Sequence, residues 1–483
     1  MARDWRDERI EELEKLVEQQ RQENAAQRKE IASQRKEIAA LRERLAKLEE
    51  RLGKTSRNSS KPPSSDGPSA PPRRKRKRGR RKRKQGAQPG HDKHERQLVP
   101  VEEVDELVVL KPELCGCCGE ALEGDDPAPH RHQVFELPEV RPKVAEWQLH
   151  SLWCDRCEAV TTAQLPDGVP TRAFGPSVDA AVALLSGAYR LSKRLVAAVM
   201  EDLLGLRMSV GSVVACERSA SEALAPPVEE ASAFAAEQPF KHADETGWRE
   251  ENKRFWLWAV VTQFVTVFMV HARRNTDAAR ELLGKASGIL HTDRHGAYNW
   301  WPTKQRQVCW SHLERDINAI AERGGDSERL GNALLDEVHR MFHWWHRVRD
   351  GTLARSTFQS YMRPLMKRVE DLFAVGAELP HPRTSRTCSK ILKLKDALWT
   401  FVRIEGVEPT NNAAEHAVRH GVIWRKTSFG TQSAAGSRFV ERVLTVHATL
   451  RQQKRNVLAF IRDACEARLH GHAPPTLLPT NRR

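Results

Sequence analysis

Three acidic residues, Asp244, Asp293 and Glu415, stand where they could do phosphoryl-transfer chemistry. Asp244 precedes a long apolar run, Asp293 ends the apolar stretch 288–293, and Glu415 lies in the segment 409–419, which is typical of the first turns of a helix. Two carboxylates on strands and one on a helix can hold two divalent cations about 3.5–4 Å apart, which activate an attacking oxygen and stabilise a leaving one on phosphorus. Mg²⁺ suits such a site because it takes oxygen ligands.

The alternative for these acids is that they are ordinary surface carboxylates, since the chain has 64 acidic residues. Their context favours a site. The run 255–270 is rich in β-branched and aromatic residues, which predicts two paired strands after Asp244. Asn411 or Asn412 can cap the helix that carries Glu415. Each acid would then lie at the end of a buried element, from which carboxylates can reach a common point.

Two Cys-x-x-Cys pairs, Cys115 with Cys118 and Cys154 with Cys157, have the spacing of metal ligands. Four thiolates from two such turns make a closed tetrahedral site, so we predict one structural Zn²⁺ in a small domain over residues 98–170. Cys117 could replace Cys115 or Cys118. The segment 133–152 between the pairs is expected to form a hairpin. A reduced, metal-free loop is the alternative, and it fits poorly because so small a region has little core.

The basic residues of the chain are concentrated in one run. The formal net charge is +15, which indicates a polyanionic partner, with nucleic acid first and an anionic membrane surface second. A run with nothing to bury does not fold alone, so the segment 53–97 is expected to be a disordered basic linker. The run is either a solvated tail or a DNA contact, and we predict the contact. Its basic residues are Arg73, Arg74, Lys75, Arg76, Lys77, Arg78, Arg80, Arg81, Lys82, Arg83 and Lys84.

Residues 7–52 carry a heptad repeat in which six of seven a positions are apolar. The pattern predicts a parallel coiled coil and therefore a homodimer or higher oligomer, and Asn24 at an a position favours two strands. Gln at three d positions weakens the middle of the repeat, and a single solvated helix is the alternative. The apolar a and d residues are Ile10, Leu13, Val17, Ile31, Ile38, Leu41, Leu45, Leu48 and Leu52.

The N-terminal segment is charged and lacks the apolar stretch of a signal peptide. The longest apolar run, 255–270, is shorter than the roughly 20 residues that span a bilayer, and it contains Thr262, Gln263 and Thr266. We therefore expect no membrane association and an intracellular location. Nine cysteines, an odd number, fit a reducing compartment and metal ligation better than a disulfide framework.

Residues 171–235 are expected to be helical. Ser192 can cap a helix from Lys193 to Leu204 that ends at Gly205, and Ser209 can cap the next helix. Two helices joined by a short turn permit a helix-turn-helix that reads DNA, although plain helical packing has the same spacing.

The segment 236–470 is expected to form a mixed α/β core with a helical insertion at about 316–408, followed by a tail at 471–483. Apolar residues recur at helical spacing throughout the insertion. Trp344 and Trp345 are expected to be core residues there and not a platform for stacking bases. The periodic residues are Leu330, Leu334, Val338, Met341, Trp345, Val348, Met362, Leu365, Val369, Leu372 and Phe373.

Several segments, in order along nearly the whole chain, resemble transposases of the insertion-sequence-66 family. The resemblance is specific because unrelated motifs agree. They are the segment 58–66, the two Cys-x-x-Cys pairs, the segments 243–246 and 291–293 with Tyr298, the segment 309–315, and the segment 411–415 with Arg419, Arg425 and Lys426.

The resemblance implies a multidomain α/β protein of the DDE group: a coiled coil, a small zinc-binding domain, a helical segment and a ribonuclease-H-like core with a helical insertion. It implies that Asp244, Asp293 and Glu415 are the catalytic residues and bind Mg²⁺, two ions per active site. One departure is Arg294, which follows the second acid where the family often has Gly.

Other residues of the matching motifs have more than one interpretation. Arg419, Arg425 and Lys426 could bind DNA phosphates along one path. Arg419 could instead pair with Glu415, which lies one helical turn away. His312 could ligate a metal, contact DNA or be a satisfied histidine at a helix start.

The function that follows from the resemblance is DNA transposition. The protein would bind the ends of a mobile element, cleave a phosphodiester bond and join the freed 3′-OH to target DNA. Its partners would be double-stranded DNA and small accessory proteins of the same element, in the bacterial cytoplasm at the nucleoid. The alternatives are a non-catalytic zinc-containing DNA-binding regulator, which leaves the three acids unused, and a nuclease on the same core, which cuts without joining.

Overall fold

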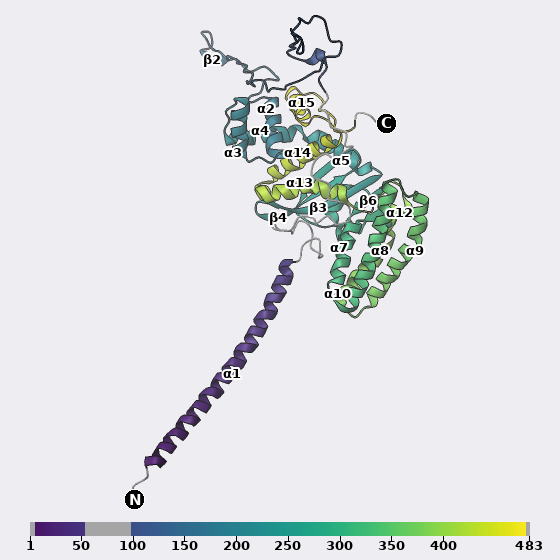
Figure 1. Cartoon of the computed structure of the whole chain (residues 1–483). Coiled ribbons are helices and arrows are strands. Elements are labelled where there is room, and N and C mark those ends of the chain that lie inside the picture. Colours follow the sequence, from purple (N-terminus) through teal and green to yellow (C-terminus); the bar gives the residue numbers. More distant parts are fainter. Residues whose placement is uncertain (1–4, 54–97, 480–483) are drawn as a thin grey trace. The chain divides into compact units, whose positions relative to one another are not determined.

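The computed structural model describes residues 5–53 and 98–479 of the chain (Figure 1). It contains two compact units, one within residues 1–70, 146–201 and 207–483 and the other within residues 71–145 and 202–206. The basic run 73–84 and the segment 58–66 lie outside the described residues. Within the described parts, no helix is both long enough and apolar enough to cross a bilayer.

The heptad segment is one continuous helix, α1 (Trp5–Gly53), which confirms the helical prediction. Its apolar a and d side chains have no partner surface within the described part of the single chain: Ile38 is 50% exposed and Leu45 is 58% exposed. The side chains of Leu48 and Leu52 lie outside the described part. Pairing of α1 with a second copy stays a prediction.

The hairpin predicted at 133–152 is wrong. Residues 133–150 contain no strand, and the hairpin of this region is formed further along by β1 (Ser151–Cys154) and β2 (Ala159–Thr162). Pro138 and Pro142 interrupt the expected strands because each removes a backbone donor. The second unit contains the short helix η2 (Val101–Glu103). Just before it, the side-chain amide of Gln133 accepts from the Val99 N–H and donates to the Val99 carbonyl, each at 2.9 Å.

The helical segment is confirmed in detail. Its elements are α2 (Pro176–Ala183), the π-helix η3 (Leu184–Ala188), α3 (Lys193–Leu204), α4 (Val210–Ala223) and α5 (Ala225–Glu237). Ser192 Oγ accepts from the Leu195 N–H at the start of α3, and Ser209 Oγ accepts from the Ser212 N–H at the start of α4. Gly205 follows α3 with a positive φ of 64°, a conformation that glycine adopts without strain. A helix-turn-helix that reads DNA stays a prediction.

A five-stranded mixed sheet follows, with the strand order β5-β4-β3-β6-β7. The first three strands of this sheet, β3 to β5, form an antiparallel meander, which confirms the two paired strands predicted after Asp244. β6 and β7 then continue the sheet parallel to β3. The strands are β3 (Phe240–Glu250), β4 (Lys253–Val261), β5 (Thr266–His271), β6 (Ile289–Thr292) and β7 (Arg306–Val308).

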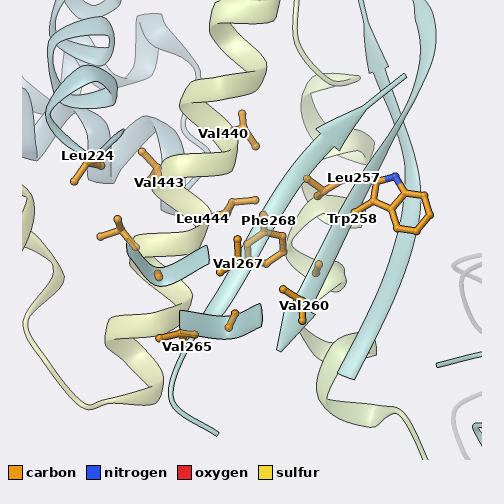
Figure 2. Close-up of a cluster of buried hydrophobic side chains, with 14 of the residues drawn as sticks. Leu224, Leu257, Trp258, Val260, Val265, Val267, Phe268, Val440, Val443 and Leu444 are labelled. Atoms are coloured by element: carbon orange, nitrogen blue, oxygen red, sulfur yellow. The ribbon is translucent and has the colours of Figure 1, made fainter. Parts of the chain in front are cut away.

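The main hydrophobic core lies between this sheet and the C-terminal helices. Figure 2 shows Val443 and Leu444 of α14 (Ala434–Gln452) beside Val267 and Phe268 of β5. The edge strand β5 is also covered in the plane of the sheet: Thr449 and Thr445 accept the backbone N–H groups of Thr266 and Phe268, each at 3.0 Å. The remaining helices around the sheet and the helical segment are α6 (Thr276–Leu283), η4 (Gly296–Tyr298), η5 (Thr303–Gln305), α13 (Asn412–Ser428) and α15 (Val457–His470).

The predicted insertion is a helical bundle around a second hydrophobic core, which also includes Ile289 of β6 and Val308 of β7. It begins at Trp310, six residues before the predicted boundary. Of the periodic residues, Val348 and Leu372 are partly buried and the others are buried, and Trp345 is a core residue as expected. Its helices are α7 (Trp310–Ala321), α8 (Gly325–Arg349), α9 (Arg355–Glu378), α10 (Pro382–Leu392), α11 (Lys395–Leu398) and α12 (Thr400–Arg403).

Candidate active site and cysteine turns

Asp244 lies in the middle of β3 and not at a strand end, because β3 pairs with β4 as far as Glu250. Successive strand residues point to opposite faces. His242 bonds to Asn411 at the start of α13, and Trp248 packs against Trp424 of the same helix, with 6.3 Å between ring centroids. Asp244 is an even number of residues from both His242 and Trp248, so its carboxylate lies on the same face of β3, which is the face that α13 covers.

Asp293 directly follows β6, as predicted. In the parallel register of β3 and β6, Phe240 pairs with Ile289 and His242 pairs with His291. Asp244 lies two residues after His242, and Asp293 lies two residues after His291. The two acids therefore stand side by side on neighbouring strands. The Asp293 carboxylate accepts the N–H of His295 at 2.8 Å, and Arg306 donates to the Asp293 carbonyl at 2.8 Å. These bonds hold the turn after β6.

Glu415 is brought to the same place by the packing of α13. The Asn411 amide donates to the carbonyl of Ala243 at 2.8 Å, and its oxygen is 3.1 Å from His242 Nδ1. Asn411, one of the two residues expected to cap the helix, is at the N-cap position, but its side chain makes no capping bond because its amide bonds to the strand instead. Gly421 permits the close approach, because a Cβ there would stand 2.2 Å from the Leu257 side chain.

The electrostatics of the cluster reflect its acids. Burial, and then the negative charges of Glu245, Asp293 and Glu415, raise the pKa of Asp244 well above its usual range. The carboxylates of Glu245, Asp293 and Glu415 are thus close enough to Asp244 to repel its negative charge. The structure brings together the three acids that were singled out from the sequence.

Glu245, next to Asp244 on the opposite face of β3, is a functional candidate to which the sequence argument gave no role. It is buried, accepts from the Tyr298 hydroxyl and pairs with Arg274 at 2.6 Å. The same guanidinium is 3.9 Å from Asp293, so Arg274 links the two acids. Burial, and then the charge of Asp293, raise the pKa of Glu245, while Tyr298 and Arg274 lower it. Tyr298 stood in the matching motif, but no spacing pointed to Arg274.

The donor set of the cluster fits a divalent cation. Asp244, Asp293 and Glu415 offer carboxylate oxygens, which Mg²⁺ and Mn²⁺ accept. Burial and, after it, the neighbouring negative charges raise the pKa of Asp244, and a bound cation relieves such repulsion between carboxylates.

The residues around the cluster have specific partners. Arg294, the departure from the family pattern, pairs with Asp316 of α7 through Nε at 2.9 Å. His312 Nδ1 is 3.2 Å from Glu415 Oε1, and the buried Cys309 thiol is 3.9 Å from the same oxygen. His312 is thus part of the site's surroundings and not a remote helix-start residue.

The three predicted DNA contacts on α13 differ in their surroundings. Arg419 and Lys426 are exposed, and within the described residues Arg419 has no ion pair with Glu415. Arg425 is partly buried and donates to the Gly247 carbonyl at 2.7 Å, which ties the end of α13 to β3. Arg425 therefore has a structural bond in addition to any role toward DNA.

The two cysteine pairs form turns of the same design, one in each compact unit. In the first, Gly119 donates to the Cys115 carbonyl at 3.0 Å and has a φ of 77°. In the second, Glu158 donates to the Cys154 carbonyl at 2.9 Å and has a φ of 53°. Backbone N–H groups, chiefly of Cys118 and Cys157, lower the pKa values of Cys115 and Cys154. Lowered thiol pKa values favour the thiolate, which is the form that binds metal.

Comparison with known proteins agrees with this arrangement. The zinc-finger binding domain of transposase IS66 matches residues 112–158, which hold both cysteine pairs, and a family of unknown function matches residues 3–97. The uncharacterized protein y4qI of Sinorhizobium fredii is 23% identical over 225 residues, which cover 41% of this chain and 41% of that protein. The chain thus matches less than half the length of this relative.

The longest match covers the central part of the chain. The transposase IS66 family model matches residues 172–438, which contain the helical segment, the sheet, the insertion and all three acids. Because the match exceeds half of the 483 residues, the chain belongs to the transposase IS66 family.

Proposed function

We propose that this transposase cleaves the ends of its mobile element and joins the freed 3′-OH to target DNA, with Asp244, Asp293 and Glu415 as the catalytic residues. The observation that carries the proposal is the meeting of the three carboxylates from β3, the end of β6 and α13. The strand order β5-β4-β3-β6-β7, with an antiparallel meander followed by two parallel strands, supports a ribonuclease-H-like core.

The three acids would hold two Mg²⁺ ions. When bound, such ions activate the attacking oxygen and stabilise the leaving one in an in-line displacement. The residues of the chain do the positioning. Asn411 fixes α13 against β3, Arg274 holds Glu245 beside Asp293, and Arg306 holds the turn that carries Asp293. Arg419 and Lys426, which are exposed on the same helix as Glu415, would contact DNA phosphates.

Binding and assembly complete the proposal. The basic run 73–84 would give sequence-independent affinity for DNA. One Zn²⁺ held by the four cysteines would order the zinc-binding domain. Because two element ends must be cut and joined together, the protein would act as a dimer or a higher oligomer, with α1 as the pairing element.

The test is a cleavage and joining assay on a duplex that carries the element end, with Mg²⁺ present. Wild type should yield both cleaved and joined products. Asp244→Asn, Asp293→Asn and Glu415→Gln should each lower cleavage by at least about a hundredfold, since metal-ion stabilisation is worth several kcal/mol. End binding, measured by gel shift, should persist. Asp371→Asn, which changes an exposed acid on α9, is the matched control.

Two results would change the assignment. Cleavage at the wild-type rate in any one of the three variants would remove that acid from the catalytic set. Cleavage without joining by the wild type, at all target DNA concentrations, would identify a nuclease on the same core.

A further inference from the structure

A sulfur, a nitrogen and an oxygen converge beside the acid cluster. Cys309 Sγ is 3.9 Å and His312 Nδ1 is 3.2 Å from Glu415 Oε1, and ligand atoms of the three residues all lie within 4.8 Å of one another. Cys309 and His312 are placed by the first turn of α7, whose start is fixed because Trp310 donates to the Pro409 carbonyl at 2.9 Å. Two elements thus bring three potential metal ligands together.

His312 Nδ1 has no hydrogen bond although it is buried. Its neighbour Glu415 Oε1 is near enough at 3.2 Å, but the two atoms lack the alignment of an N–H···O bond. Buried polar atoms are nearly always hydrogen-bonded, so an unpaired one needs an explanation. A cation between the imidazole and the carboxylate would satisfy both atoms at once.

The spacing of the three atoms fits a shared ion. Two ligands at about 2.1 Å from an ion and a tetrahedral angle apart are separated by about 3.4 Å, and a sulfur at about 2.3 Å is then about 3.6 Å from an oxygen. The observed separations of 3.2 Å and 3.9 Å are close to these values. Mg²⁺ takes oxygen ligands, whereas imidazole and thiolate select first-row transition metals.

We propose that Cys309, His312 and Glu415 form a binding site for a divalent first-row transition metal ion. A coordinated thiol loses its proton to solvent, so binding releases one proton per ion. The site shares Glu415 with the acid cluster, and loading it therefore competes with the use of Glu415 by the Mg²⁺ of that cluster. Neither Asp244 nor Asp293 supplies a ligand, so variants of these two acids test the catalytic proposal without removing a ligand of this site.

Co²⁺ is the probe, because its visible absorption reports sulfur and nitrogen coordination. The full-length protein, loaded with Zn²⁺ at its cysteine turns, is titrated with Co²⁺ in the absence of Mg²⁺, because Mg²⁺ at the acid cluster would compete for Glu415. Wild type should retain one more Co²⁺ per chain than His312→Ala. Cys309→Ser should lose the sulfur-to-cobalt absorption band. Loss of either ligand should raise the Co²⁺ concentration needed for half-saturation by more than about tenfold.

Two controls separate this site from other thiols and imidazoles. His416→Ala removes an exposed histidine next to Glu415, and Cys388→Ser removes a buried thiol in the insertion; both should bind Co²⁺ as wild type does. Equal Co²⁺ uptake and equal spectra in wild type, His312→Ala and Cys309→Ser would overturn the proposal. If circular dichroism shows that His312→Ala is unfolded, the absorption band of Cys309→Ser decides.

The catalytic proposal is tested separately by Asp244→Asn. That variant should keep the Co²⁺ site and lose DNA cleavage. Cleavage retained in Asp244→Asn would count against the catalytic proposal while the Co²⁺ result stands, and unchanged Co²⁺ binding in the ligand variants would count only against the transition-metal site.

Discussion

The side-chain amide of Asn411 donates to the backbone carbonyl of Ala243 at 2.8 Å, and this bond joins the start of α13 to the residue before Asp244. Asn411 is fully buried, and its own backbone carbonyl accepts the N–H of Glu415 at 3.1 Å. One residue therefore connects the strand that carries one acid with the helix that carries another.

Asn411→Ala should lower the cleavage rate by about a hundredfold, because a displacement of about 1 Å in a catalytic group has an effect of that size. It should also destabilise the fold by about 1–3 kcal/mol, since the Ala243 carbonyl is left unpaired in the interior. Rates come from end-cleavage assays and stability from denaturant unfolding. Asn412→Ala, at the exposed neighbouring position, is the control. Equal rates in both variants would contradict the positioning role.

One Zn²⁺ per chain is expected through Cys115, Cys118, Cys154 and Cys157. Serine at any of the four should lower the zinc content measured by atomic emission and make residues 98–170 sensitive to protease, since structural zinc supplies folding energy. Cys117→Ser should leave the zinc content unchanged, because the two turns share one backbone design in which Cys115 and Cys118 correspond to Cys154 and Cys157. A metal-free protein of the same stability would refute this prediction.

Replacing half of the basic residues between Arg73 and Lys84 by Gln should weaken binding to specific and random duplex DNA alike. The slope of log affinity against log salt should become shallower by about 0.9 for each phosphate that the protein no longer neutralises. Fluorescence anisotropy at several salt concentrations measures both effects. An unchanged slope would show that this run does not touch DNA.

The double variant Ile38→Asp and Leu45→Asp should be monomeric in sedimentation and should fail to pair two element ends while still binding one. Both residues are at a positions, so the new charges would be buried in the seam between two copies of α1. Ala39→Asp with Ala40→Asp adds the same charge at positions outside the seam and is the control. Normal end pairing by the first variant would mean that α1 serves another contact and the core dimerises elsewhere.

Local signals in the sequence predicted local structure well. Ser192, Gly205 and Ser209 marked the ends of α3 and the start of α4, and the β-branched runs after Asp244 became β4 and β5. Composition alone misled at 133–150, where Pro138 and Pro142 outweigh the β-branched residues.

Long-range contacts within the site were beyond sequence reasoning. Asn411 was expected to cap its own helix, yet it bonds to Ala243, 168 residues away, and Arg425 was expected to face DNA, yet it also bonds to Gly247, 178 residues away. Arg274 gave no local signal for its contact with Glu245, because tertiary packing alone brings the two together. The residue types of the site could be predicted, but the bonds that hold them could not.

The helical insertion leaves and rejoins the α/β core at nearly the same point, since the backbone of Trp310 bonds to that of Pro409. The hydrophobic core of the bundle is separate from the main core, but it includes Ile289 of β6 and Val308 of β7, so the base of the bundle packs on the sheet. Only the part of the bundle that does not touch these strands is therefore free to vary without moving Asp293 or Glu415. That part is a natural place for exchange or fusion of a foreign domain, provided that the anchoring turn around Cys309 is kept.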